Sequence, residues 1–248
     1  MSDQLTGRRG IVTGGSSGIG YAVCNHLAKE GATVYAISRT GTVKEGLAPL
    51  PENVIHVQGD VTDHGRMREV IEEIAAGGPI DFLVNDAGIT KKCRAEDFPI
   101  EDFEHIMDVN VTAIFHLCQL CYPYLKESAH KGRIVNISSM AAHLGFSLVT
   151  PYCISKSAVL GITRGLAIEW ANDNICVNSV APGWFPSEMS KQVMTPERKA
   201  AILARMPVHE FGDPDDLGAM IAFLLSDGAS YITGQDFAVD GGALAYGF

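Results

Sequence analysis

Short apolar segments alternate with longer segments of helical periodicity along nearly the whole chain. Short apolar runs between turn residues predict buried strands, whereas apolar residues spaced three and four apart predict helices that cover a sheet. The predicted strands are 10–13, 33–37, 54–57, 82–84, 134–137 and 176–180, and the predicted helices are 22–29, 67–75, 103–125 and 152–171. This order predicts a parallel sheet with right-handed crossovers and helices on both faces.

The chain has no linker rich in proline, glycine or serine, no charge block and no internal repeat that would divide its 248 residues. We therefore expect one doubly wound α/β domain over residues 1–248. Residues 184–210 interrupt the alternation, and a helical stretch there follows Thr195 and Pro196, which are suited to a helix start. An insertion at the carboxyl edge of a parallel sheet is typical of a substrate-binding lid, and a surface helix that only packs is the alternative.

The composition, with 46% hydrophobic and 19% charged residues, is ordinary for a soluble α/β protein. A net charge of −10 argues against nucleic acid as a partner, because phosphate binding requires a basic surface. No apolar run approaches the ~18 residues that span a bilayer, and the first residues form no apolar signal segment, so we expect a cytoplasmic protein without a membrane partner. The six cysteines and eight histidines show no metal-ligand spacing, so we expect no metal.

A glycine-rich loop, Thr13-Gly14-xxx-Gly18-Ile19-Gly20, follows the first predicted strand and opens the first predicted helix. Backbone N–H groups at such a helix start bind the pyrophosphate of a dinucleotide. The loop alone is a weak signal, because many glycine-rich turns are only turns.

Tyr152 and Lys156 are four residues apart, so on a helix they share one face. The lysine charge favours the phenolate and is expected to lower the pKa of the tyrosine. Thr150 and Pro151 predict an N-cap and first helical position, which would put the phenol near the positive end of the helix dipole. Reduction of a ketone by a nicotinamide needs one proton donor and a second hydrogen-bond donor at the oxygen, and Ser139 precedes Tyr152 by thirteen residues.

Together these motifs resemble those of the short-chain dehydrogenase/reductase family, whose fold is a single Rossmann-type sheet. The further matches, in chain order, are Asp60-Val61, Asn85-Asp86-Ala87-Gly88, Asn110, Ser139, Tyr152 with Lys156, Pro182-Gly183 and residues 234–242. Asp86 departs from the family pattern, which has asparagine there, and a buried carboxyl would need donors or an altered pKa.

The resemblance implies a catalytic role for four residues. Tyr152 is the expected general acid and base, Lys156 lowers its pKa and binds the ribose hydroxyls, and Ser139 holds the substrate oxygen. Asn110 is expected to support a water-linked proton path, and it also suits a helix kink. Ser138 is expected to be only a structural neighbour of Ser139, because successive strand side chains point to opposite faces.

The resemblance also implies a nucleotide site. The residues expected along the cofactor are Gly14, Ser16, Ser17, Gly18, Ile19, Gly20, Asp60, Val61, Asn85, Ala87, Gly88, Tyr152, Lys156, Pro182, Gly183 and Ser187. Asp60 and Val61 are expected at the adenine, and Ser187 is expected at the nicotinamide carboxamide or else is a turn hydroxyl.

The segment Ser38-Arg39-Thr40 follows the second strand, where the choice between the two nicotinamide cofactors is made. A guanidinium with two hydroxyls suits a phosphate dianion, so we expect NADP(H) in preference to NAD(H). A solvated surface charge is the alternative for Arg39, and Ser17 stands where many NADP-using relatives have a second basic residue.

The carboxyl-terminal half resembles both sugar-acid and polyol dehydrogenases of the gluconate 5-dehydrogenase kind and 3-oxoacyl thioester reductases. An acyl carrier protein is acidic and would favour a basic docking patch, so the negative net charge favours a small polar carbonyl or alcohol substrate. Lys191, Arg198 and Arg205 could meet a substrate carboxylate, and a solvated helical face is the alternative for at least two of them. A catalytically silent dinucleotide-sensing protein is a further alternative, although none of Ser139, Tyr152 and Lys156 is missing.

The helices 103–125 and 152–170 have apolar residues on more than one stripe, and a second stripe indicates a second partner. These residues are Phe115, Leu117, Leu120 and Tyr124 on the first helix and Val159, Leu160, Ile162, Leu166 and Trp170 on the second. The resemblance implies that the two helices pair across a two-fold axis in a homotetramer.

Overall fold

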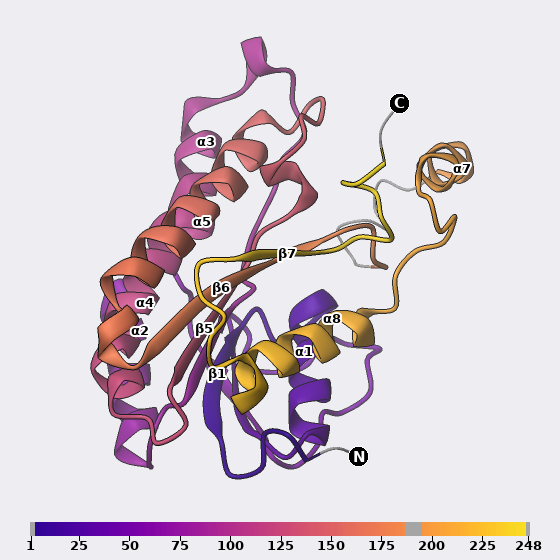
Figure 1. The fold of residues 1–248 in the computed structure, drawn as a ribbon. Coiled ribbons are helices and arrows are strands. Elements are labelled where there is room, and N and C mark those ends of the chain that lie inside the picture. The colour runs from indigo at the N-terminus through magenta and orange to yellow at the C-terminus, as the bar shows by residue number, and fades with distance from the viewer. Residues whose placement is uncertain (1–2, 187–194, 247–248) are drawn as a thin grey trace.

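The computed structural model describes residues 3–186 and 195–246, which form one parallel sheet in the order β3-β2-β1-β4-β5-β6-β7 (Figure 1). Its strands are β1 (Arg9–Thr13), β2 (Thr33–Ser38), β3 (Val54–Gln58), β4 (Phe82–Asn85), β5 (Gly132–Ile137), β6 (Ile175–Pro182) and β7 (Asp236–Val239). Every strand pair is parallel, which confirms the predicted doubly wound class.

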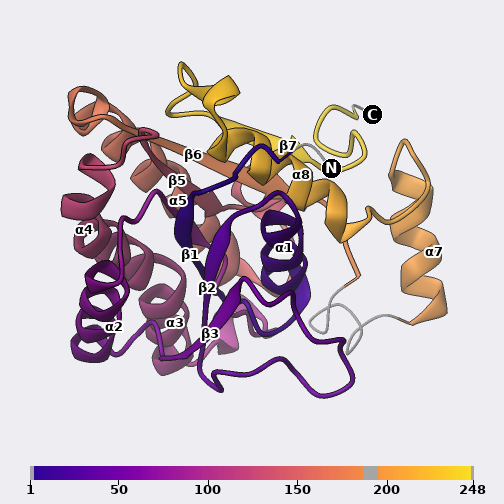
Figure 2. The ribbon, with the colours of Figure 1, turned by 90° about the horizontal axis from the view of Figure 1, so that it is seen from below.

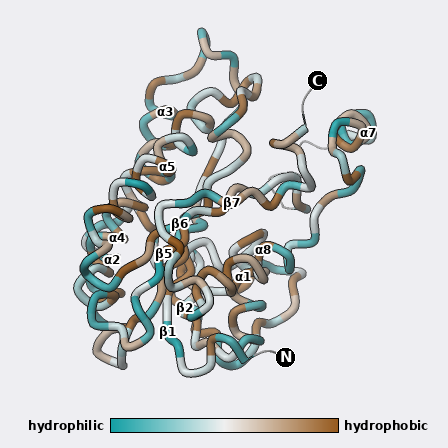
Figure 3. The backbone as a smooth tube through the Cα atoms, viewed as in Figure 1, coloured by the Kyte–Doolittle hydropathy of each residue, from teal (hydrophilic) through white to brown (hydrophobic). Residues whose placement is uncertain are grey.

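Helices cover both faces of the sheet, as expected (Figures 1 and 2). They are α1 (Gly18–Lys29), α2 (His64–Ala76), α3 (Ile100–Met107), α4 (Ala113–Lys126), α5 (Thr150–Glu169), α7 (Pro196–Arg205) and α8 (Pro214–Leu225). Alternate strand residues supply two separate cores: Val12 packs with α1 and α8, whereas Ile11 packs with α2, α4 and α5. Figure 3 shows hydrophobic stretches in the middle of the sheet and along α8.

The sheet reverses its winding between β1 and β4. Chain order runs one way through β2 and β3 and the other way through β5, β6 and β7, so the carboxyl ends of β1 and β4 lie side by side, with Thr13 paired to Asn85. Ligands of doubly wound sheets bind in the crevice at this switch point. The turns that follow Thr13 and Asn85 therefore border the expected cofactor site.

The predicted helix over 103–125 is two helices joined by a π-helical turn at Asp108–Thr112. Asn110 in this turn is fully buried. Its amide oxygen accepts from the N–H of Ile89, and its amide nitrogen donates to the carbonyl of Ile89. The side chain thus pairs the backbone N–H and C=O of Ile89 in a neighbouring loop. These bonds favour the wider π-helical turn over a regular α-helical turn.

The second apolar stripe on these helices is smaller than the sequence suggested. Leu117, Val159 and Leu166 are buried in the protein's own core, and Leu120, Tyr124, Ile162 and Trp170 pack against it. The exposed apolar residues on α4 and α5 are Phe115 (43% exposed), Ile154 (44%) and Ile168 (78%). Most of the named residues therefore belong to the stripe that covers the sheet, and Phe115 is the one among them that is exposed.

Within the part of the chain that the structure describes, no helix is long and apolar enough to cross a membrane. Helix α7 stands apart from both helical layers (Figures 1 and 2). Thr195 caps it, since its hydroxyl accepts from the N–H of Arg198 at 3.2 Å, as the sequence predicts.

Candidate active site at the switch point

The glycine-rich turn between β1 and α1 lies tightly against the neighbouring strands. Gly14 and Gly18 have φ of +75° and +58°, which favour glycine. A Cβ on Gly14 would lie 3.1 Å from the nitrogen of Ala87, and one on Gly15 would lie 2.8 Å from the Cβ of Ala36. A Cβ on Gly18 would meet nothing within 4 Å, so the turn is open on the side where α1 begins.

Helix α1 begins at Gly18, on this open side of the turn. Ser17 is the N-cap residue, yet its side chain makes no capping hydrogen bond. Donors at the start of a helix bind anions, and the positive end of the helix dipole adds to the attraction. The turn therefore fits the diphosphate of a dinucleotide.

Thr13 connects the end of β1 to the loop after β4 through hydrogen bonds. Its hydroxyl oxygen accepts from the N–H groups of Asp86 and Ala87, each at 3.1 Å. The side chain of Asn85 lies in the interior, where its amide donates to Asn136 at 2.8 Å. Asn85 thus supports the sheet with its side chain, and the crevice is bordered by the residues after it.

Asp86 extends toward the glycine-rich turn. Its Oδ2 lies 3.1 Å from the place of a Cβ on Gly14 and 2.6 Å from that of a Cβ on Gly20, and its carboxyl accepts the backbone N–H of Gly20. Desolvation raises the pKa of Asp86 to about 7, and the charge of Lys156 and the Gly20 N–H oppose this rise. The departure from the family pattern is therefore a titratable group in the crevice.

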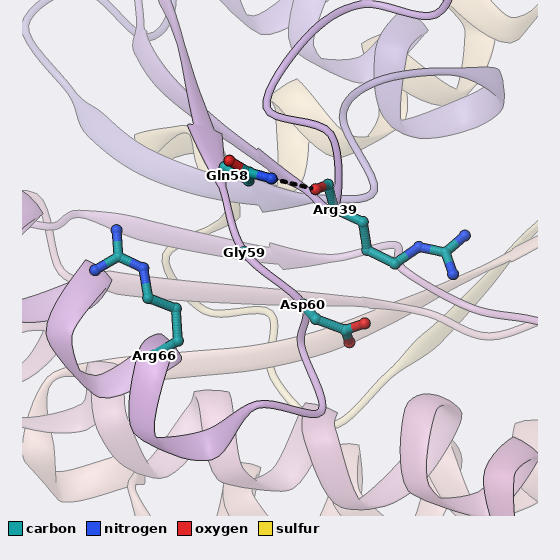
Figure 4. A pocket seen from close by; sticks show the side chains of 5 residues that line it. All are labelled: Arg39, Gln58, Gly59, Asp60 and Arg66. Atoms are coloured by element: carbon teal, nitrogen blue, oxygen red, sulfur yellow. Dashed lines mark hydrogen bonds between the residues drawn. The ribbon is translucent and has the colours of Figure 1, made fainter.

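The opposite end of the crevice holds a pocket of about 430 Å³, lined by Arg39, Gln58, Gly59, Asp60 and Arg66. The side chains of Arg39 and Asp60 project toward the same side, whereas Arg66 points away from them (Figure 4). Thr62 donates to the Asp60 carboxylate through its N–H at 3.0 Å and its hydroxyl at 2.8 Å. These bonds, with the more distant charge of Arg39, lower the pKa of Asp60.

The predicted phosphate cluster is only partly free. Arg39 and Thr40 are exposed, but Ser38 is buried and its hydroxyl oxygen accepts from the N–H of Gly41 at 3.1 Å. Arg39 is the available cation at this end of the crevice.

Ser139 and Tyr152 meet at the carboxyl end of β5. The hydroxyl of Ser139 bonds the phenol, and its oxygen also accepts from the N–H of Ala141 at 3.1 Å. Ser138 points elsewhere, donating to the carbonyl of Val180 and to Asp236. The structure thus brings Ser139, and not Ser138, to the tyrosine.

Helix α5 starts one residue earlier than the sequence suggests. Thr150 is its first residue and Val149 is the N-cap, with no side-chain capping bond, so the expectation that Thr150 caps the helix is wrong. Pro151 occupies the first turn, where a missing N–H is tolerated. Tyr152 still lies in the first turn, as expected.

Tyr152 has a raised pKa, which corrects the expectation that Lys156 lowers it. Burial is the largest cause, the Ser139 hydrogen bond lowers the pKa, and the charges of Asp86 and Cys153 raise it. The Nζ of Lys156 lies 5.7 Å from the phenol ring centre and donates to the carbonyl of Ile137 at 2.7 Å. Burial lowers the pKa of Lys156 to about 8, against the attraction of Asp86.

Asn110 ties the loop after β4 to the catalytic helix. Its amide nitrogen donates to the carbonyl of Ile89 at 2.9 Å and to the hydroxyl of Ser155 at 3.0 Å. Its oxygen accepts from the N–H of Ile89 at 2.8 Å. The side chain therefore holds the site together, and its part in a water-linked proton path stays a prediction.

The far wall of the crevice begins where β6 ends. Gly183 follows Pro182 and donates to the carbonyl of Val239, and a Cβ there would lie 2.5 Å from the Cα of Asp240. Ser187 and Lys191 lie outside the described residues, as do residues 187–194 of the predicted lid.

The sequence pattern did not single out Lys92, which lies in the loop after β4. Burial and the charge of Arg198 on α7 lower its pKa. Neither cation has an ion-pair partner among residues 3–186 and 195–246. That Lys92 and Arg198 interact is a signal that sequence spacing alone could not give, because they meet only through the fold.

Comparisons with known proteins show the family of this chain. The family described as "Enoyl-(Acyl carrier protein) reductase" matches residues 14–243. The chain belongs to the short-chain dehydrogenase/reductase family. It is 35% identical to a 2-dehydro-3-deoxy-D-gluconate 5-dehydrogenase of Bacillus subtilis, over 98% of this chain and 96% of that one.

Two further members of the family are similar over nearly their whole length. The chain is 39% identical to a 3-oxoacyl-[acyl-carrier-protein] reductase of Thermotoga maritima, over 96% of this chain and 98% of the relative. The crystal structure of a gluconate 5-dehydrogenase from Burkholderia cenocepacia, in complex with NADP and tartrate, superposes with a TM-score of 0.90. That protein is 29% identical, and the match covers 99% of this chain and 98% of the other.

Proposed function

We propose that this protein is an NADP(H)-dependent oxidoreductase that interconverts a ketone and a secondary alcohol on a small polar substrate, such as a sugar acid. The observation that carries the proposal is the meeting of Ser139 and Tyr152 with Lys156 beside a glycine-rich turn that fits a diphosphate. Membership of a family with dehydrogenase and reductase relatives supports the same reaction type.

The chemistry divides between the cofactor and the chain's own residues. A bound nicotinamide supplies or accepts the hydride. Tyr152, whose raised pKa keeps it protonated at neutral pH, donates a proton to the carbonyl oxygen during reduction and must be deprotonated for oxidation. The N–H of Ala141 holds the oxygen of Ser139 in place, and the hydroxyl proton that Ser139 shares with Tyr152 would turn to the substrate oxygen. Lys156, with a pKa of about 8, provides positive charge behind the tyrosine.

The cofactor would extend from the adenine pocket to the catalytic helix. We assign the diphosphate to Gly14, Ser16, Ser17, Gly18, Ile19 and Gly20, the adenine to Asp60 and Val61, and the nicotinamide half to Ala87, Gly88, Pro182 and Gly183. Arg39, with Thr40 beside it, would bind the 2′-phosphate of NADP, because it is the exposed cation of the adenine pocket.

A carboxylate on the substrate could bind Lys92 and Arg198, which lack an ion-pair partner among the described residues. Lys92 comes from the loop after β4 and Arg198 from α7, and the charge of Arg198 acts on Lys92. The Burkholderia relative, solved with NADP and tartrate, and the sugar-acid dehydrogenase of Bacillus support an anionic substrate. The alternative is a 3-oxoacyl thioester reductase, which the Thermotoga relative supports.

A substrate panel tests the proposal. Sugar acids, polyols, diketones and 3-oxoacyl esters should be offered with NADP(H) and with NAD(H), and turnover followed at the nicotinamide absorbance. We expect turnover of a sugar acid with NADP(H) and weak turnover of the corresponding uncharged polyol. Preference for the 3-oxoacyl esters would favour the alternative, and no turnover of any carbonyl or alcohol would contradict the reaction class.

We further propose a cytoplasmic homotetramer that pairs through the helices of residues 103–125 and 152–170. Phe115, Ile154 and Ile168 support this assembly, since they leave apolar area exposed on these helices.

A further inference from the structure

Asp86 is a carboxyl group placed where a cofactor diphosphate would repel it. It follows β4 at the switch point, and its side chain lies against Gly14 and Gly20 of the glycine-rich turn. It accepts the N–H of Gly20, one of the first donors of α1. The same helix start is the anion-binding position of the proposed dinucleotide site.

The carboxyl has no contacting cation among the described residues. Three ionisable side chains on the elements packed against it interact with its charge: Cys24 from α1, and Tyr152 and Lys156 from α5. Lys156, the one cation of the three, gives its close hydrogen bond to the carbonyl of Ile137. Asp86 therefore lacks a salt bridge that would hold it ionised.

The protonated and ionised forms of Asp86 are both populated near neutral pH, since desolvation raises the pKa of Asp86 to about 7. A diphosphate at the start of α1 would bring two further negative charges to a helix end that already holds this carboxylate. Repulsion between like charges at close range favours the neutral form of the group that can accept a proton.

We propose that Asp86 takes up a proton from solvent when the dinucleotide binds and releases it when the dinucleotide leaves. The inference rests on the proposed cofactor site and adds a link between cofactor affinity and pH that belongs to this chain's own carboxyl. An asparagine, as in the family pattern, could not provide it, because an amide does not titrate.

The direction of the pH effect follows from this linkage. Well below pH 7 the carboxyl is already neutral in the free protein, and the dinucleotide binds with its full affinity. As the pH rises through about 7, the free protein loses this proton and binding must restore it. Affinity then falls by up to about ten-fold per pH unit, until the pKa of the bound form is passed.

Proton uptake at Asp86 would also act on the catalytic tyrosine. The charge of Asp86 raises the pKa of Tyr152. Neutralising it on cofactor binding removes that contribution, so the phenolate needed for alcohol oxidation forms more readily once the cofactor is present.

The test measures binding and protonation directly, without turnover. NADPH is suitable because its nicotinamide is uncharged, and its affinity should be measured by calorimetry from pH 6.5 to 8.5 for the parent and for Asp86→Asn. The 2′-phosphate, whose pKa is about 6, contributes equally to both proteins. Asp81→Asn is the matched control, because Asp81 is a buried carboxyl that precedes the same strand β4 at its other end.

We expect the parent and Asp81→Asn to lose about ten-fold or more of their NADPH affinity over this range relative to Asp86→Asn. An infrared difference spectrum of the parent at pH 8 should gain the absorption of a protonated carboxyl when NADPH is added. This second measurement needs no variant, so it decides the matter even where Asp86→Asn folds poorly.

Two results would overturn the inference alone: NADPH binding to the parent without a new protonated carboxyl, or an unchanged pH dependence in Asp86→Asn. Failure of the parent to bind NADPH or NADH at any pH would instead overturn the proposed function, and this inference with it.

Discussion

At the scale of single residues, the site brings together ionisable side chains whose pKa values the fold shifts away from their usual range. Tyr152, Lys156 and Asp86 lie in one crevice, and burial is the largest influence on the pKa of each. Burial disfavours the charged form, so it moves the two acids and the base in opposite directions toward neutrality. Asp86 and Lys156, with pKa values of about 7 and about 8, are therefore charged only part of the time near neutral pH, and clusters of such groups are typical of active sites.

Tyr152→Phe removes the proposed proton donor and keeps the ring. We expect kcat to fall by about 100-fold or more, because the substrate oxygen loses its acid, while NADPH affinity stays within a few-fold of the parent. Tyr122→Phe is the matched control, since Tyr122 bonds Asp173 away from the crevice. A near-native kcat in Tyr152→Phe would show that the proton comes from another group.

Arg39→Asp replaces the exposed cation of the adenine pocket with a charge that repels a phosphate and accepts from a ribose hydroxyl. We expect kcat/KM with NADPH to fall by about ten-fold or more and the preference to move toward NADH. Arg66→Asp is the control, because Arg66 lines the same pocket but bonds Glu69 and Glu73 and points away (Figure 4). An unchanged cofactor ratio in Arg39→Asp would place the 2′-phosphate elsewhere.

At the scale of elements, the apolar patterns predicted β1 to β6 and most helices, because the strands are short apolar runs and each of these helices has an apolar face. The pattern did not predict β7, which is short and only partly buried. Periodicity did not show the helix break at Asp108–Thr112, although the polar side chain of Asn110 suggested a kink there, and its hydrogen bond to Ile89 joins residues twenty-one apart in the chain. Helix α8 escaped it too: its apolar residues are nearly continuous, and a short continuous run fits a strand or a buried helix equally well.

The sequence also predicted only part of the candidate site, because only residues on one element can be placed together by their spacing. Tyr152 and Lys156 share a helix, so spacing alone places them together. The raised pKa of Tyr152 and the approach of Asp86 to Gly20 depend on contacts between α5, α1 and the loop after β4, and no local pattern encodes these.

Gly20→Ala tests the close packing of the glycine-rich turn. The added Cβ would lie 2.5 Å from the carbonyl oxygen of Gly14 and 2.6 Å from Oδ2 of Asp86, so the turn must shift. We expect a loss of about 1–3 kcal/mol in the free energy of unfolding and at least ten-fold weaker NADPH binding. Both are measurable, by denaturant titration and by calorimetry.

Gly65→Ala, in the first turn of α2, is the matched control. Its Cβ would meet Asp63 Oδ1 at 3.6 Å, an ordinary contact, so stability should be unchanged or rise by about 0.5–1 kcal/mol. Equal effects of the two substitutions on NADPH binding would mean that the turn does not hold the cofactor.

At the scale of the whole molecule, the catalytic helix is also the proposed assembly surface. Ile168 and Ile154 on α5 are 78% and 44% exposed and Phe115 on α4 is 43% exposed, although most other large apolar residues of both helices are buried or half-buried. Tyr152 and Lys156 lie on the same helix, so contact with a second copy would restrain the element that positions them.

Light scattering at micromolar concentration tests the assembly. We expect a mass of four times the 26.6 kDa chain for the parent and a smaller mass for Ile168→Glu, because a carboxylate in an apolar interface is desolvated without a partner. Ile55→Glu is the control, since Ile55 is 42% exposed but belongs to the edge strand β3. In the strand order β3 is distant from β5 and β6, the two strands that α5 connects. If association braces the catalytic pair, the dissociated Ile168→Glu protein should lose kcat while it keeps its secondary structure. A fully active parent of 26.6 kDa would refute both the assembly and its role in catalysis.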